Sequence, residues 1–130
     1  MDDPRAREDA LDEFLALYAA GRFFDAHEVL EGAWRRSPDP QMRFLQGLIQ
    51  WAVAFEHHRR GNAHGARALI ERAIRNLADA PPGDMGLDLG AARIAATGLR
   101  LRFVEWENGG ARPEVAAPAI RRGARPSGET

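Results

Sequence analysis

Apolar residues recur along the chain with the spacing of one face of an α-helix, and no stretch alternates long enough to predict a strand. The first such segment can be capped by Asp2 or Asp3, carries Pro4 in its first turn and ends at Gly21. The apolar stripe of this helix is made of four residues, Leu11, Phe14, Leu15 and Tyr18.

Four further helices are predicted by the same periodicity, over about residues 23–36, 41–60 and 63–80, with a fifth between Asp88 and Asn108. The segment 41–60 is apolar around most of its circumference, which is typical of a helix that packs on more than one side. We therefore expect it near the centre of the fold.

A weak internal repeat supports this layout. Residues 18–34 align with residues 58–74, so that Gly21 meets Gly61 and each copy is a helix, a glycine turn and a returning helix. The pattern predicts an all-α fold, a compact antiparallel bundle of about five helices containing two hairpins that resemble tetratricopeptide hairpins. Residues 1–108 form the predicted bundle domain and residues 109–130 a flexible tail, of which residues 115–120 can lie on the bundle.

Length and composition narrow the class of protein. A chain of 130 residues suits one domain. Its net charge of −1 predicts no binding to nucleic acid or to a membrane surface. The absence of cysteine removes disulfides, thiolate nucleophiles and cysteine-based zinc sites. With no signal-like N-terminus and no apolar run long enough for a membrane span, we expect a cytoplasmic protein.

The stretch RFFDAHEVLEGAW in the second helix carries the first candidate chemistry. Projection at about 100° per residue places His27 and Trp34 within the apolar stripe and Glu31 on its shoulder. Glu28 projects away from this face, so we expect it to face solvent or a flanking helix. His27 and Glu31 are therefore predicted to share a partly buried edge.

A second polar set lies on the third helix. Gln46, Gln50 and His57 project within about 40° of one another on an otherwise apolar helix. Neutral amides in an arginine- and glutamate-rich chain indicate a partly buried stripe whose groups find hydrogen-bond partners. Because the connection Ser-Pro-Asp-Pro is short, we expect this stripe to face His27 and Glu31.

Three roles remain open for this polar cluster. It can be a structural cluster that fixes helix register. It can hold a divalent transition metal through His27, Glu31 and His57, although the chain lacks both the second histidine of His-Glu-x-x-His and a Glu-x-x-His pair. It can also line a pocket for a small molecule or a peptide, with Trp34 and Phe24 as walls. Two more histidines, His58 and His64, are predicted to be solvated.

The segments FFDAHEVLEGAW and FLQGLIQWAVAFEHHRRGNAHGA together resemble the bacterial family catalogued as domain of unknown function 309. The resemblance covers about residues 8–107. Its pattern falls on nine positions: His27, Glu28, Glu31, Trp34, Gln46, Gln50, His57, Gly61 and Asn62. Glu56 departs from the pattern, which implies an aromatic residue at this position. The resemblance implies a compact all-helical domain in a small, stand-alone cytoplasmic protein, and it implies no activity.

The sequence favours a non-catalytic interaction or scaffold module without a cofactor, which associates with itself or with a protein partner. The alternative is a metal- or small-molecule-binding protein, which could include an enzyme. It would use His27, Glu31 and His57, with Gln46 and Gln50 orienting the ligand.

Overall fold

Within the residues that the computed structural model describes, 3–78, 80 and 82–123, the chain forms five α-helices. Their bounds are α1 Pro4–Ala19, α2 Phe23–Arg36, α3 Gln41–Arg60, α4 Ala63–Ala78 and α5 Gly90–Glu107. The all-helical class predicted from the sequence is confirmed, and α2 and α3 have the predicted bounds. Helix α4 ends at Ala78, earlier than the expected position 80.

The ends of the first helices follow from local chemistry. The Asp3 carboxylate accepts from the backbone N–H groups of Arg5 and Ala6 and so caps α1. Gly21 and Gly61 have φ values of +76° and +79°, the left-handed conformation that glycine adopts without a steric penalty. These two glycines let α2 and α4 return along the helices that precede them.

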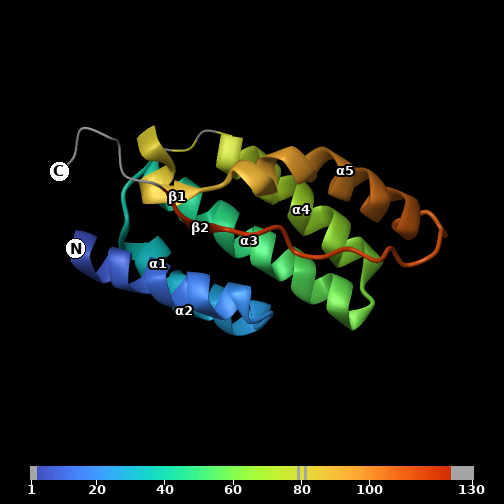
Figure 1. Ribbon diagram of the computed structural model, residues 1–130, viewed down its shortest axis with the longest axis horizontal. Coiled ribbons are helices and arrows are strands. Elements are labelled where there is room, and N and C mark those ends of the chain that lie inside the picture. The colour runs from blue at the N-terminus through green and yellow to red at the C-terminus, as the bar shows by residue number, and fades with distance from the viewer. Residues whose placement is uncertain (1–2, 79, 81, 124–130) are drawn as a thin grey trace.

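Each helix packs mainly on its neighbours in sequence, which makes an array of antiparallel hairpins with α3 in the middle (Figure 1). Among the described residues, the four largest fully buried side chains are Phe14 of α1, Phe44 and Trp51 of α3, and Phe103 of α5. As predicted, α3 is buried around most of its circumference. Aromatic contacts continue along the core from Phe14 through Tyr18, Phe23 and Phe55 to Phe103.

The α4–α5 connection contains a short 3₁₀ segment, Pro82–Gly86, and the strand β1, Leu87–Asp88. Strand β1 pairs in antiparallel fashion with β2, Arg121–Arg122. Asp88, from which the fifth helix was expected to begin, lies in β1, and its carboxylate accepts from the N–H of Gly90, the first residue of α5, at 2.9 Å. Periodicity did not indicate these two-residue strands, because they form only when the end of the chain returns to β1.

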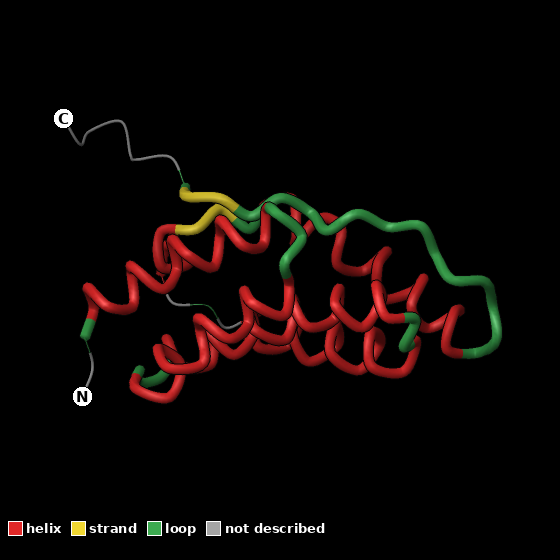
Figure 2. Tube along the Cα trace, turned by 90° about the horizontal axis from the view of Figure 1, so that it is seen from below, coloured by secondary structure: helices red, strands yellow, loops and turns green. Residues whose placement is uncertain are grey.

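Of the tail expected from residue 109, the structure describes residues 109–123. We call residues 111–123 the C-terminal strap. The strap leaves the end of α5 and runs back along the length of the molecule to β1 (Figures 1 and 2). Ile120 is buried, and Arg122 pairs with Asp12 and Glu8 of α1. The strap therefore lies on the bundle, as allowed above for residues 115–120, while residues 124–130 fall outside the described part.

Candidate functional site

His27 is held by its own helix. Its Nδ1 donates to the backbone oxygen of Phe24 at 2.7 Å, and its Nε2 lies 3.3 Å from Glu31 Oε1. Since a carbonyl oxygen only accepts, Nδ1 is the donor of this hydrogen bond. The His27 side chain is 16% exposed, while the Glu31 side chain is 42% exposed and also lies 3.8 Å from Arg35. The predicted shared edge of α2 exists, and Glu28 is exposed, which is one of the two surroundings expected for it.

The polar stripe of α3 is half-buried, as its neutral amides indicated. The hydrogen-bond partners of Gln50 and His57, however, belong to the α3–α4 hairpin. Gln50 Oε1 accepts from Asn76 Nδ2 of α4 at 2.7 Å, and Asn62 Nδ2 donates to His57 Nδ1 at 3.1 Å. Gln46 lies half-buried on the same stripe. The hydrogen bonds of Gln50 and His57 thus connect α3 to α4 and the turn before it, whereas we expected them to connect α3 to α2.

The His57 ring occupies space that only a glycine in α4 leaves free. A Cβ atom added to Gly65 would lie 2.6 Å from His57 Cγ, closer than real contacts allow. This burial, together with the positive charge of Arg60, lowers the pKa of His57. The imidazole is therefore biased towards its neutral form. In that form Nδ1 can accept the hydrogen bond that Asn62 Nδ2 donates.

The predicted metal ligands are not assembled. Among the residues that the structure describes, no three His, Asp or Glu side chains are grouped so that they could hold a metal ion. His27 and Glu31 do approach each other, but His57 turns to Asn62 and Gly65. The projection placed these residues on matching faces and could not tell which neighbouring helix each face would meet.

Trp34 reaches the interior with its polar atom unpaired. Its Nε1 and the Oε1 atom of Gln41 are buried and have no hydrogen-bond partner in the described part of the chain. A buried unpaired donor lowers the stability of the folded state. Phe24, the other expected pocket wall, is exposed and lines a hollow of about 380 Å³ with Asp25, Glu56 and Arg60.

Glu56 is a site residue that sequence reasoning treated only as a departure from a pattern. It is 5% exposed and accepts hydrogen bonds from Arg59 and Arg60, both at 2.6 Å. The hydrogen bond from Arg59 is the largest cause that lowers the pKa of Glu56. The spacing of these arginines, three and four residues further along α3, was the signal that could have revealed the pairing.

His58 corrects the expectation of a solvated side chain. It is half-buried, its Nε2 donates to the backbone oxygen of Pro113 at 2.7 Å, and its ring stacks on Phe103. This contact was invisible to periodicity because Pro113 lies 55 residues further along the chain. His64, in contrast, is exposed and pairs with Glu107 of α5 at 2.9 Å.

An ionic network connects α4 to α5. Arg67 donates to both Glu71 and Glu107, and Arg100 of α5 donates to Glu71 at 3.0 Å. The hydrogen bonds from Arg67, and then from His64, lower the pKa of Glu107 to about 2. In the sequence alone the polar face of α4 resembles a solvated stripe, but these side chains are partly buried because α5 covers them.

These features define a small all-helical protein whose polar residues are arranged within and between neighbouring hairpins. The chain belongs to the family described as "Domain of unknown function (DUF309)", whose pattern matches residues 11–69. The resemblance drawn from the two sequence motifs is therefore confirmed.

Relatives of this chain are uncharacterised proteins. It is 41% identical over 90 residues to the uncharacterised protein YpuF of Bacillus subtilis (strain 168), covering 67% of this chain and 50% of that protein. It is 31% identical over 81 residues, 60% of this chain and 24% of the relative, to an uncharacterised protein of Aquifex aeolicus (strain VF5). The chain thus spans about half the length of the first relative and a quarter of the second.

A crystal structure of the conserved hypothetical protein TTHA0068 from Thermus thermophilus has the same fold, with a TM-score of 0.58 and 35% identity. The match covers 72% of this chain and 95% of that protein. In the described part of our chain, no helix combines the length and apolar character needed to cross a membrane.

Proposed function

We propose that this protein is a non-catalytic interaction module in which the polar residues of α2 and α3 have a structural role. The observation that carries this proposal is the direction of their hydrogen bonds. His27 bonds to its own helix, Gln50 bonds to Asn76, and His57 bonds to Asn62, so these groups do not converge on one point. Catalysis and metal binding need convergent groups around a shared centre.

Two variants test the structural role, His27→Ala and His57→Ala. We expect each to lower the midpoint of thermal unfolding, because each removes a hydrogen bond and side-chain packing. The wild-type midpoint should be the same with and without added Zn²⁺. A wild-type protein that is purified with bound metal, or that is stabilised by Zn²⁺ only while both histidines are present, would favour the metal-binding alternative.

The proposed contact surface is the outer face of α5, defined by Ile94, Gly98 and Leu101. Ile94 is 88% exposed and Leu101 is 53% exposed, although both are large apolar side chains. A Cβ atom added to Gly98 would meet nothing within 4 Å, so this part of the helix surface is open to close approach. Exposed apolar groups that line up on one helix face are typical of an association surface.

A second copy of the chain is the partner that fits this spacing. Ile94 and Leu101 are seven residues apart, with Gly98 between them. When two such helices cross in antiparallel fashion about a two-fold axis, Ile94 of each copy lies over Leu101 of the other. An interface made of one helix face is small, so the association is expected to be weak and dependent on concentration.

Sedimentation equilibrium of the wild type and the double variant Ile94→Arg/Leu101→Arg tests this surface. We expect the wild-type mass to rise with concentration, and the variant to stay monomeric with an unchanged unfolding midpoint. Glu28→Arg, at an exposed position on α2, is the matched control and should associate like the wild type. A wild type that is monomeric up to about 1 mM, a weak-binding limit, would exclude self-association.

A further inference from the structure

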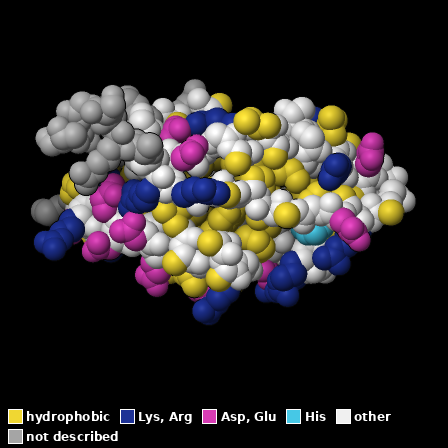
Figure 3. All heavy atoms as spheres, in the orientation of Figure 1, with side chains coloured by type: hydrophobic (Ala, Val, Ile, Leu, Met, Phe, Trp, Pro, Cys, Tyr) yellow, Lys and Arg dark blue, Asp and Glu magenta, His cyan; other side chains and the backbone are white. Residues whose placement is uncertain are grey.

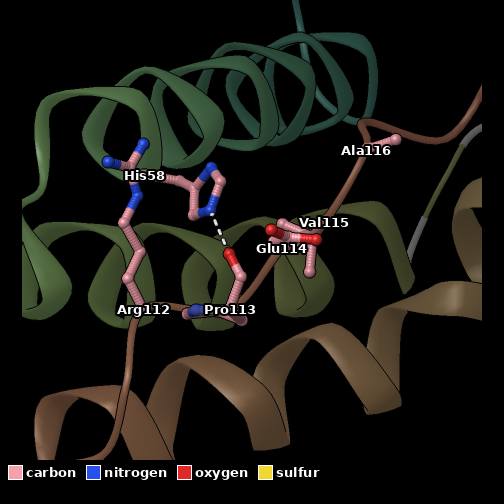
Figure 4. Close-up of a pocket in the computed structure, with 6 residues that line it drawn as sticks. All are labelled: His58, Arg112, Pro113, Glu114, Val115 and Ala116. Atoms are coloured by element: carbon pink, nitrogen blue, oxygen red, sulfur yellow. Dashed lines mark hydrogen bonds between the residues drawn. The ribbon is translucent and has the colours of Figure 1, made fainter.

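The C-terminal strap is held through its backbone carbonyl groups. His58 Nε2 donates to the carbonyl of Pro113 at 2.7 Å, and Tyr18 Oη donates to the carbonyl of Pro118 at 2.6 Å. Figure 4 shows the His58 ring pointing from α3 towards the Pro113 carbonyl. Both acceptors belong to prolines, which have no N–H of their own to satisfy. The bundle therefore holds the strap through backbone carbonyl groups, which every peptide carries.

The two donors are oriented by the bundle. The His58 ring stacks on Phe103, with ring centres 5.8 Å apart, and meets the edge of Trp106. The Tyr18 hydroxyl accepts from Trp51 Nε1 at 3.0 Å, which leaves its own proton to be donated outwards. Because α1, α3 and α5 position these groups, the donors would keep their directions towards any chain that replaced the strap.

The strap fills its groove incompletely. Its side chains near and between the two anchors include Ala116, Ala117 and Ala119. Hollows of about 670 Å³ and 380 Å³ lie against Ala116, and one of about 510 Å³ lies against Ala117 and Ala119. Figure 3 shows hydrophobic side chains gathered in a band along the middle of this face. There is therefore room for apolar side chains larger than alanine at these positions of the strap.

We infer that this groove is a binding site for an extended, apolar, proline-containing segment of a partner protein, and that the strap is the chain's own ligand for it. The carbonyl donors His58 and Tyr18 set the register of the bound segment. The hollows beside Ala116 and Ala119 select larger apolar side chains. The pairing of β1 with β2 shows that the far end of the groove also accepts a short added strand.

This site adjoins the outer face of α5, because Ile94 and Gly98 also line the hollow of about 380 Å³ beside Ala116. The carbonyl donors Tyr18 and His58 belong to α1 and α3, so a change at Tyr18 tests the groove without altering the association surface on α5. Competition with the strap would govern access, because a tethered segment acts at a millimolar effective concentration. A partner segment must therefore either bind more tightly than the strap or meet a chain whose strap has been released.

The test uses the full chain with a protease recognition sequence inserted between Gly110 and Ala111, where both residues are exposed. Cleavage after folding leaves the strap bound without a covalent link. The probe is a fluorescein-labelled peptide with the sequence of residues 111–123, and its anisotropy reports binding. A scrambled peptide of the same composition, with the prolines moved, is the matched control.

We expect the cleaved protein to bind the probe saturably, and the uncleaved protein to bind it at least about tenfold more weakly because its own strap competes. A probe with Ala116→Leu and Ala119→Leu should bind about fivefold more tightly, since it buries more apolar surface. In the protein, Tyr18→Phe should weaken binding of both probes about fivefold by removing one donor.

Two results would overturn the inference. If the helical circular dichroism of the cleaved protein collapses when the strap dissociates, the strap is part of the core and not a ligand. If the scrambled peptide binds as tightly as the probe, or the leucine probe binds more weakly than the parent, the groove does not select the proposed segment. Binding is measured below the protein concentration at which sedimentation shows association, so a failure here leaves the proposed self-association to its own test.

Discussion

The indole N–H of Trp51 donates to the hydroxyl oxygen of Tyr18 over 3.0 Å in the interior of the bundle. The same hydroxyl donates to Pro118, so one polar atom connects α1, α3 and the C-terminal strap. Burial raises the pKa of Tyr18, and the hydroxyl stays protonated as this arrangement requires. The link satisfies the only polar group of the Trp51 side chain, which is otherwise enclosed by the core.

The first prediction concerns this link. Tyr18→Phe removes the acceptor of the Trp51 N–H and leaves it buried and unpaired, which costs about 1–3 kcal/mol of unfolding free energy. Urea denaturation measures this loss. The double variant Tyr18→Phe/Trp51→Phe should lose less than the sum of the two single changes, because it removes both partners. Additive losses would show that the bond contributes little.

The second prediction compares two glycines. Gly65→Ala places a Cβ 2.6 Å from the His57 ring, and we expect a loss of about 1–3 kcal/mol from overpacking. Gly98→Ala, in the open middle of α5, should instead stabilise the protein by about 0.5–1 kcal/mol through helix propensity. Combining Gly65→Ala with His57→Ala should recover part of the loss. A harmless Gly65→Ala would mean that α4 does not approach His57 so closely.

The third prediction concerns acid. The pKa of Glu107 is about 2 in the folded protein and near 4.5 ordinarily, so its ion pairs stabilise the fold above about pH 4.5. This contribution is lost as the pH falls towards 2. We expect Glu107→Gln to lower the unfolding midpoint at pH 7, with the difference from wild type shrinking between pH 4.5 and 2. The exposed Glu105→Gln is the control, and an equal effect from it would argue against the network.

The fourth prediction concerns Trp34. Because its Nε1 is buried without a partner, Trp34→Phe removes an unpaired donor along with some apolar area. We expect this change to cost less than about 1 kcal/mol, whereas Trp34→Ala should cost about 2–3 kcal/mol through lost packing. Chemical denaturation of both variants checks the difference. If Trp34→Phe costs as much as Trp34→Ala, the indole N–H makes a bond that the described residues do not reveal.

Amino-acid order by itself determined the five helices, the bounds of α2 and α3, and the faces that bury apolar residues. Asp3, Gly21 and Gly61 act on the backbone beside them, and apolar spacing is a property of a single helix, so both could be read without knowing the fold. The half-burial of Gln46, Gln50 and His57 was predictable for the same reason. Projection around an axis tells which way a side chain points.

Only the tertiary structure decided what each side chain meets. Gln50 pairs with Asn76 instead of the face that carries His27, because α4 lies on that side of α3. His58 is covered by Pro113, since a segment rich in alanine and proline finds its place through bundle donors and not through its own periodicity. Contacts over 26 to 100 residues depend on how the helices pack together, and no local pattern specifies them.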